Sequence, residues 1–147
     1  MPDTVVPVTI RLTVRTALWR SHVASVVNRV DGLVPVVKGN GYGFGRLELA
    51  RIAAEFSDAV AVGTVHELRG LPEEVTPIVL TPTLTAPGTT AAVLTVANTF
   101  HVDALVDWQG RVIVKLTSSM HRYGRGPELV GAARAADPAT PDWPCIW

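Results

Sequence analysis

A short apolar run that ends in a lysine and a glycine-rich turn constrains this chain most. The run covers residues 33–37 without polar alternation, which is typical of a strand buried on both faces of a parallel sheet. Lys38 follows directly, and glycines then occupy every second position from Gly39 to Gly45. Apolar residues at near-helical spacing predict a helix over 46–56. The segment therefore predicts a strand, a lysine at its carboxyl end, a glycine turn and a helix.

Lys38 is a candidate cofactor anchor because of its position in this unit. Ligands of α/β folds collect at the carboxyl ends of parallel strands. A lysine amine condenses with aldehydes, and pyridoxal phosphate is an aldehyde cofactor. The glycines supply backbone N–H groups that can come close to a ligand, and the following helix would present its N-terminus to a phosphate. The alternative interpretation is a lysine that only extends from a strand end into water, with glycines that serve only the turn.

The rest of the chain alternates short apolar runs with helical patterns. Strands are predicted at 5–13, 59–62, 77–80 and 111–116. Helices are predicted at 16–30, 65–70, 89–97 and 128–136, whereas 100–106 fits either a strand or a helix. This alternation indicates an α/β fold with a parallel sheet and right-handed crossovers.

A second lysine-bearing segment follows the predicted strand 111–116. Lys115 lies near the end of that strand, and a polar turn leads from it to Arg122 and Gly124. Because the carboxyl ends of parallel strands meet at one edge of a sheet, we expect this segment and Lys38 to face one site. Arginine offers a fixed, permanently charged fork for oxygen ligands.

Both segments resemble the alanine racemase family, whose members are fold-type III enzymes that use pyridoxal phosphate. In the first segment the residues that match the family's cofactor-lysine signature are Lys38, Asn40, Tyr42, Gly43 and Gly45. Glycine replaces the usual alanine at 39 and 41, and Phe44 replaces the usual histidine. In the second segment the matching residues are Lys115, Met120, Arg122 and Gly124, whereas Thr117, Ser118 and Ser119 replace the usual Asp, Thr and Gly.

The resemblance implies roles for four residues. Lys38 would hold the cofactor and act as a catalytic base, and Tyr42 would hydrogen-bond the cofactor phosphate. Arg122 would contact the cofactor's ring oxygen and bind the substrate carboxylate. Lys115, when carbamylated, would hold Arg122 in place. Packing at the strand end is the alternative role for Tyr42, and the replaced turn residues leave the aim of Arg122 open.

The resemblance also implies a (β/α)8 barrel of parallel strands, a fold that takes about 250 residues. The chain has 147 residues, so we expect an α/β fold that is a partial, truncated (β/α)8 barrel. The expected organisation is an N-terminal strand in 1–14, an incomplete alanine racemase N-terminal barrel domain in 15–136 and a tail rich in Pro and Trp in 137–147.

Composition argues against several other classes of protein. Thirteen basic and thirteen acidic residues give a formal net charge of zero, so neither nucleic acid nor a membrane surface is a predicted partner. Cys145 is the only cysteine, which leaves no internal disulfide and no cysteine-based metal cluster. We expect no metal site. The sequence shows neither a signal peptide nor an apolar run of about 20 residues, so we expect a cytoplasmic protein.

The sequence therefore predicts a pyridoxal-phosphate-dependent racemase that interconverts L- and D-alanine, present as an N-terminal fragment that is not active alone. The family's route needs a second base, a tyrosine from the C-terminal domain of the partner subunit in a homodimer, and the sequence does not contain that domain. Two alternatives stay open: a non-catalytic protein of the same barrel fold that binds pyridoxal phosphate for its homeostasis, and a decayed fragment without cofactor. Which small amino acid is the substrate also stays open.

Overall fold

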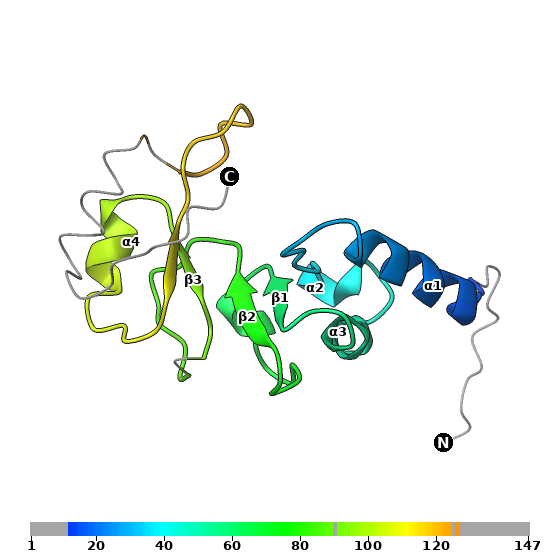
Figure 1. The fold of residues 1–147 in the computed structure, drawn as a ribbon. Helices are drawn as coiled ribbons and strands as arrows, with labels where there is room; N and C mark the ends of the chain where they lie inside the picture. Colours follow the sequence, from blue (N-terminus) through cyan, green and yellow to red (C-terminus); the bar gives the residue numbers. More distant parts are fainter. Residues whose placement is uncertain (1–11, 90, 125, 127–147) are drawn as a thin grey trace, which may run out of the picture. The chain divides into compact units, whose positions relative to one another are not determined.

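The computed structural model describes residues 12–89, 91–124 and 126, and Figure 1 shows their fold. The chain divides into two compact units, 1–33 and 34–147. Most of the strand predicted at 5–13, the helix predicted at 128–136 and the tail 137–147 lie outside the described residues. Residues 12–14 form no strand.

The first unit contains helix α1 (Thr16–Val27). The helix predicted at 16–30 is thus confirmed but ends three residues early, where Asn28 donates its N–H to the carbonyl of Ala24 at 3.0 Å. None of the residues of α1 is buried. Its leucine and valines, including Leu18 and Val26, therefore leave an apolar surface on this helix.

The second unit is built on parallel strands that follow one another in sequence order. Strand β1 (Ala59–Val62) pairs with β2 (Thr76–Val79), and β3 (Leu94–Val96) pairs with β4 (Val112–Val114). A bridge between Ile78 and Val93 connects the two pairs. A further parallel bridge, between Val36 and Ala61, places the predicted strand 33–37 beside β1. In the described residues, five neighbouring parallel segments thus share one carboxyl edge.

Helical segments connect these strands, and Figure 1 labels α3 and α4 among them. Helix α3 (Arg46–Ala54) leads to β1, the 3-10 helix η1 (Val65–Glu67) leads to β2, and α4 (Thr99–Ala104) leads to β4. Helix α4 resolves the ambiguous stretch 100–106. It begins after Asn98, whose side-chain oxygen accepts the N–H of His101 at 3.1 Å and so caps the helix.

The helix predicted at 89–97 is wrong, because this stretch contains β3. All three residues of β3 are buried. The only polar one, Thr95, donates its hydroxyl to the carbonyl of Val79 at 2.6 Å, which satisfies the group inside the sheet. Threonine and valine dominate the stretch 93–96, and β-branched side chains of this kind favour a strand over a helix.

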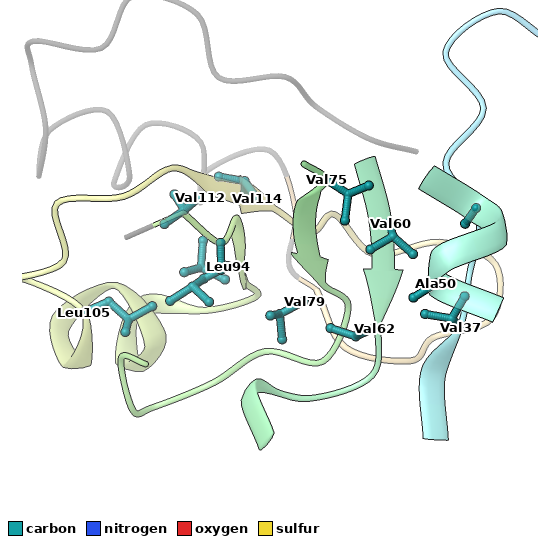
Figure 2. Packing of buried hydrophobic residues seen from close by; sticks show 13 residues of the cluster. Val37, Ala50, Val60, Val62, Val75, Val79, Leu94, Leu105, Val112 and Val114 are labelled. Atoms are coloured by element: carbon teal, nitrogen blue, oxygen red, sulfur yellow. The ribbon is translucent and has the colours of Figure 1, made fainter. Parts of the chain in front are cut away.

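One hydrophobic core runs through the second unit, as Figure 2 shows. Val37 and Ala50 pack at one end of it against Val60 on β1. Leu94 and Leu105 belong to the same cluster at its other end. Valines from four strands fill the space between, so the core fixes the order of the strands and with it the position of their carboxyl ends.

Within the described residues, no helix is both long and apolar enough to span a bilayer.

Candidate functional site

The structure places Lys38 at the carboxyl edge of the parallel strands, two residues after the bridge at Val36. Val37, between them, is only 2% exposed and belongs to the core. The side chain of Lys38 is exposed, and no hydrogen bond or ion pair connects it to any residue that the structure describes. A buried neighbour therefore fixes the main chain while the amine is accessible to a ligand.

The short segment α2 (Lys38–Gly41) is a turn more than a helix. Gly39 has φ 63° and ψ −134°, a conformation that side chains disfavour. Gly41 is buried with φ 57°, and a Cβ there would lie 3.0 Å from the backbone nitrogen of Arg46. Both positions where the family usually has alanine therefore suit glycine in this chain.

The N–H groups of the glycine turn bind within the protein. Gly43 and Gly45 each donate to the carbonyl of Asn40 at 3.1 Å, and Phe44 donates to the carbonyl of Gly41 at 3.0 Å. The expectation that glycine N–H groups are available to a ligand is therefore wrong for Gly43 and Gly45. Their hydrogen bonds instead close the turn that connects Lys38 to the start of α3.

A residue that sequence reasoning missed, Glu67, connects this turn to the sheet. Its Oε2 accepts the N–H of Gly39 at 2.9 Å and the N–H of Gly63 at 2.9 Å. Its Oε1 accepts the hydroxyl of Thr64 at 3.3 Å. Gly63 follows β1 directly, so one carboxylate holds the residue after Lys38 to the end of the neighbouring strand. Thr64 and Glu67 form a T-x-x-E pattern, a capping-box signal readable from sequence.

Glu67 carries its charge at neutral pH. Partial burial acts to raise the pKa of its carboxyl, but the two N–H groups, the Thr64 hydroxyl and the Arg46 charge outweigh it and hold the pKa below its usual value. Arg46 also donates to the main-chain carbonyl of Glu67. At neutral pH the carboxylate is therefore a charged acceptor for the N–H of the residue after Lys38.

The second predicted segment forms a loop that folds back on the end of β4. A Cβ at Gly124 would lie 2.6 Å from the main-chain carbon of Leu116, so only glycine fits there. The Nζ of Lys115 lies 5.7 Å from the centre of the Tyr123 ring, and the Cζ of Arg122 lies 5.6 Å from it. Both cations are within range of a cation–π contact. The structure thus brings Lys115 and Arg122 together around Tyr123, which sequence reasoning had not singled out.

Lys38 and Lys115 lie at the same edge of the sheet but four strand spacings apart. Neighbouring strands are about 4.8 Å apart, so the two strand ends are about 19 Å apart measured along the sheet. Curvature of the sheet shortens the direct distance. Arg122 extends from its loop beyond β4, and Tyr42 is 64% exposed beyond Lys38. It stays a prediction that the segment with Lys38 and the segment with Lys115 and Arg122 face one site.

The chemistry of these side chains fits pyridoxal phosphate in part. An accessible amine at Lys38 can hold an aldehyde, the exposed hydroxyl of Tyr42 can donate to a phosphate, and Arg122 can bind anionic oxygens. No cluster of three or more His, Cys, Asp or Glu that could hold a metal ion occurs among the described residues.

Comparison with known proteins decides the family. The family model for the N-terminal domain of alanine racemase matches residues 15–141. The chain belongs to the alanine racemase N-terminal domain family. A crystal structure of biosynthetic alanine racemase from Pseudomonas aeruginosa has a similar fold, with a TM-score of 0.63 and 21% sequence identity over 86% of this chain. A search of curated proteins found no match.

Membership of the alanine racemase family confirms the resemblance carried by the two segments. The N-terminal domain of alanine racemase is a TIM-like barrel, so the predicted fold, a partial (β/α)8 barrel with parallel strands, is confirmed as well. The family is one of pyridoxal-phosphate-dependent enzymes. The chain spans 39% of the length of the matched racemase structure.

Proposed function

We propose that this chain supplies the cofactor-anchoring part of a pyridoxal-phosphate-dependent racemase that interconverts L- and D-alanine. One observation supports this most: Lys38 is an exposed amine at the carboxyl edge of a family barrel, with no hydrogen bond or ion pair to the described part of the chain and with its main chain held on both sides. Val37 is buried before it, and the Gly39 N–H after it is bound by Glu67.

Pyridoxal phosphate, when bound, supplies an electron-withdrawing ring that stabilises the negative charge left by removal of the substrate's α-proton. Lys38 Nζ would hold the cofactor and, once the substrate's amine has replaced it there, would accept or donate the α-proton on one face of the substrate. The Tyr42 hydroxyl donates to the cofactor phosphate. Arg122 binds the substrate carboxylate and so orients the amino acid. Lys115, when carbamylated, changes from a second cation near Arg122 into its anionic partner.

The second candidate is a protein that binds pyridoxal phosphate without catalysis. Binding needs Lys38, whereas racemisation also needs a second acid–base group on the opposite face of the substrate. In the proposed racemase a tyrosine of the partner subunit in a homodimer provides that group. The two functions therefore both need Lys38 as the cofactor anchor. They differ in whether a second acid–base group lies on the face of the substrate opposite Lys38.

The anchor can be tested sharply because Lys38 and Lys115 are the only lysines in the sequence. We expect added pyridoxal phosphate, fixed by borohydride reduction, to modify Lys38 at least tenfold more than Lys115, as measured by peptide mass spectrometry. Lys38→Ala should abolish the cofactor absorbance band, and the matched variant Lys115→Ala should keep it. Equal modification of the two lysines, or none, would reject Lys38 as the anchor.

A further inference from the structure

Glu67 stands out among the charged groups that the proposed function leaves unused. It lies 28 positions after Gly39 in sequence, yet its carboxylate binds the N–H directly after Lys38 at 2.9 Å. The same oxygen binds the N–H of Gly63 at the end of β1. We infer that Glu67 is a positioning residue for Lys38, which ties the lysine's main chain to the neighbouring strand end. This inference rests on the proposed role of Lys38 as the anchor.

The conformation of Gly39 explains why such a tie is needed. Its φ of 63° and ψ of −134° lie in a region open to glycine, and glycine loses more conformational freedom than other residues when it is ordered. Before Lys38 the chain is held by the Val37 N–H, which donates to Ala61 at 2.8 Å. After Lys38 the hydrogen bond of Gly39 to Glu67 supplies the matching restraint.

Glu67 is itself held from several directions. Thr64 donates its hydroxyl to Oε1 at 3.3 Å, and Arg46, at the start of α3, donates to the main-chain carbonyl of Glu67. These contacts restrain the carboxylate independently of its hydrogen bond to the glycine turn. A held acceptor of this kind limits the positions of the Lys38 amine, and an amine with fewer positions reacts with a bound aldehyde at a lower entropic cost.

Three variants separate positioning from simple stability. Glu67→Gln keeps a carbonyl oxygen that can accept both N–H groups, whereas Glu67→Ala removes every acceptor. Gly63→Ala leaves Glu67 in the chain but displaces its carboxylate, because the added Cβ would lie 2.8 Å from Oε1. Glu74→Ala is the matched control, an exposed glutamate in the connection that leads to β2.

The experiment uses the 147-residue chain with pyridoxal phosphate as the probe, under conditions where each variant is folded by circular dichroism. The readouts are the ratio of modification at Lys38 to that at Lys115 and the hydrogen-exchange protection of the Gly39 amide. We expect Glu67→Ala and Gly63→Ala to lower the modification ratio and the Gly39 protection at least fivefold. In Glu67→Gln and Glu74→Ala the two readouts should stay within twofold of the wild type. Rescue by glutamine distinguishes lost hydrogen bonds from lost charge.

The outcomes separate this inference from the proposed function. A first outcome is modification that is selective for Lys38 and yet unchanged in Glu67→Ala and Gly63→Ala. That result would overturn the positioning role of Glu67 but would still support Lys38 as the cofactor anchor. Absence of selective modification in the wild type would overturn the anchor and the positioning role with it. A Gly39 amide that is unprotected in the wild type would show that the hydrogen bond to Glu67 does not restrain the turn, and would also overturn the inference.

Discussion

A single carboxylate joins three segments at the carboxyl edge of this sheet. Glu67 binds main-chain N–H groups at Gly39 and Gly63, and Arg46 binds the main chain of Glu67 in return. Hydrogen bonds to a charged acceptor are stronger than those between neutral groups. The turn that carries Lys38 thus depends on the protonation of a group outside the cofactor-lysine signature.

This dependence predicts how stability changes with pH. The pKa of Glu67 is lower in the folded chain than its ordinary value of 4.5, so the folded state favours the ionised carboxyl. Its contribution is fully present above that ordinary value and is lost as the pH falls through the folded-state pKa. We expect wild type to exceed Glu67→Gln by about 0.5–1 kcal/mol at neutral pH, a small difference because the side chain is partly exposed.

Urea unfolding of the two proteins at neutral pH and at about pH 3 measures this difference. The difference should shrink at the lower pH, because the Glu67 carboxyl becomes protonated as the pH falls toward its folded-state pKa. A difference that stayed constant from neutral to acidic pH would contradict the prediction, because it would have to come from packing and not from the carboxylate charge.

The site could be predicted from sequence only where adjacent residues carry its chemistry. Lys38 and its glycines stand together in the chain, so the lysine's place at a strand end was predictable. The hydrogen bond of Gly39 to Glu67 spans 28 positions, and no local pattern reveals a contact of that range. Tyr123 was missed for a related reason, since its proximity to Lys115 depends on the loop that Gly124 closes.

At the scale of elements, some strands can be predicted from their sequences more reliably than others. The strand β1, four small apolar residues between a Ser-Asp pair and a glycine, was predicted with its bounds. The stretch around β3 mixes threonine and valine over nine residues, a length that fits a helix as well as a strand. Burial decided the outcome, because β3 has neighbours on both sides and no exposed residue.

The burial of β3 gives a direct test of the element. Leu94 is fully buried and belongs to the core cluster with Leu105 and Val112. We expect Leu94→Ala to lower the free energy of unfolding by about 3 kcal/mol, because it leaves a cavity between the strands and α4. Urea or thermal unfolding measures the loss.

The matched control is Leu84→Ala, since Leu84 is 61% exposed. Its substitution should change the free energy of unfolding by no more than about 0.5 kcal/mol. A loss below about 1 kcal/mol for Leu94→Ala would mean that β3 does not form part of the core.

At the scale of the whole molecule, the parallel order of the strands could be predicted because each crossover is short and local. Consecutive strand segments lie side by side, as right-handed βα units require. What sequence could not supply is the curvature of the sheet, which sets the distance between Lys38 and Arg122. That distance depends on the curvature of the sheet, which is set by the number of strands in the barrel. The sequence of a single strand or helix does not predict this curvature.

The last prediction concerns the activity of the chain alone. A (β/α)8 barrel has eight parallel strands, and the chain spans 39% of the matched racemase. Racemisation needs proton transfer on both faces of the substrate, and Lys38 can serve only one of them. We therefore expect the 147-residue chain with pyridoxal phosphate to form D-alanine from L-alanine no faster than the free cofactor does, as measured by chiral chromatography. A rate tenfold above that of the cofactor, abolished by Lys38→Ala, would show that this chain provides both proton-transferring groups.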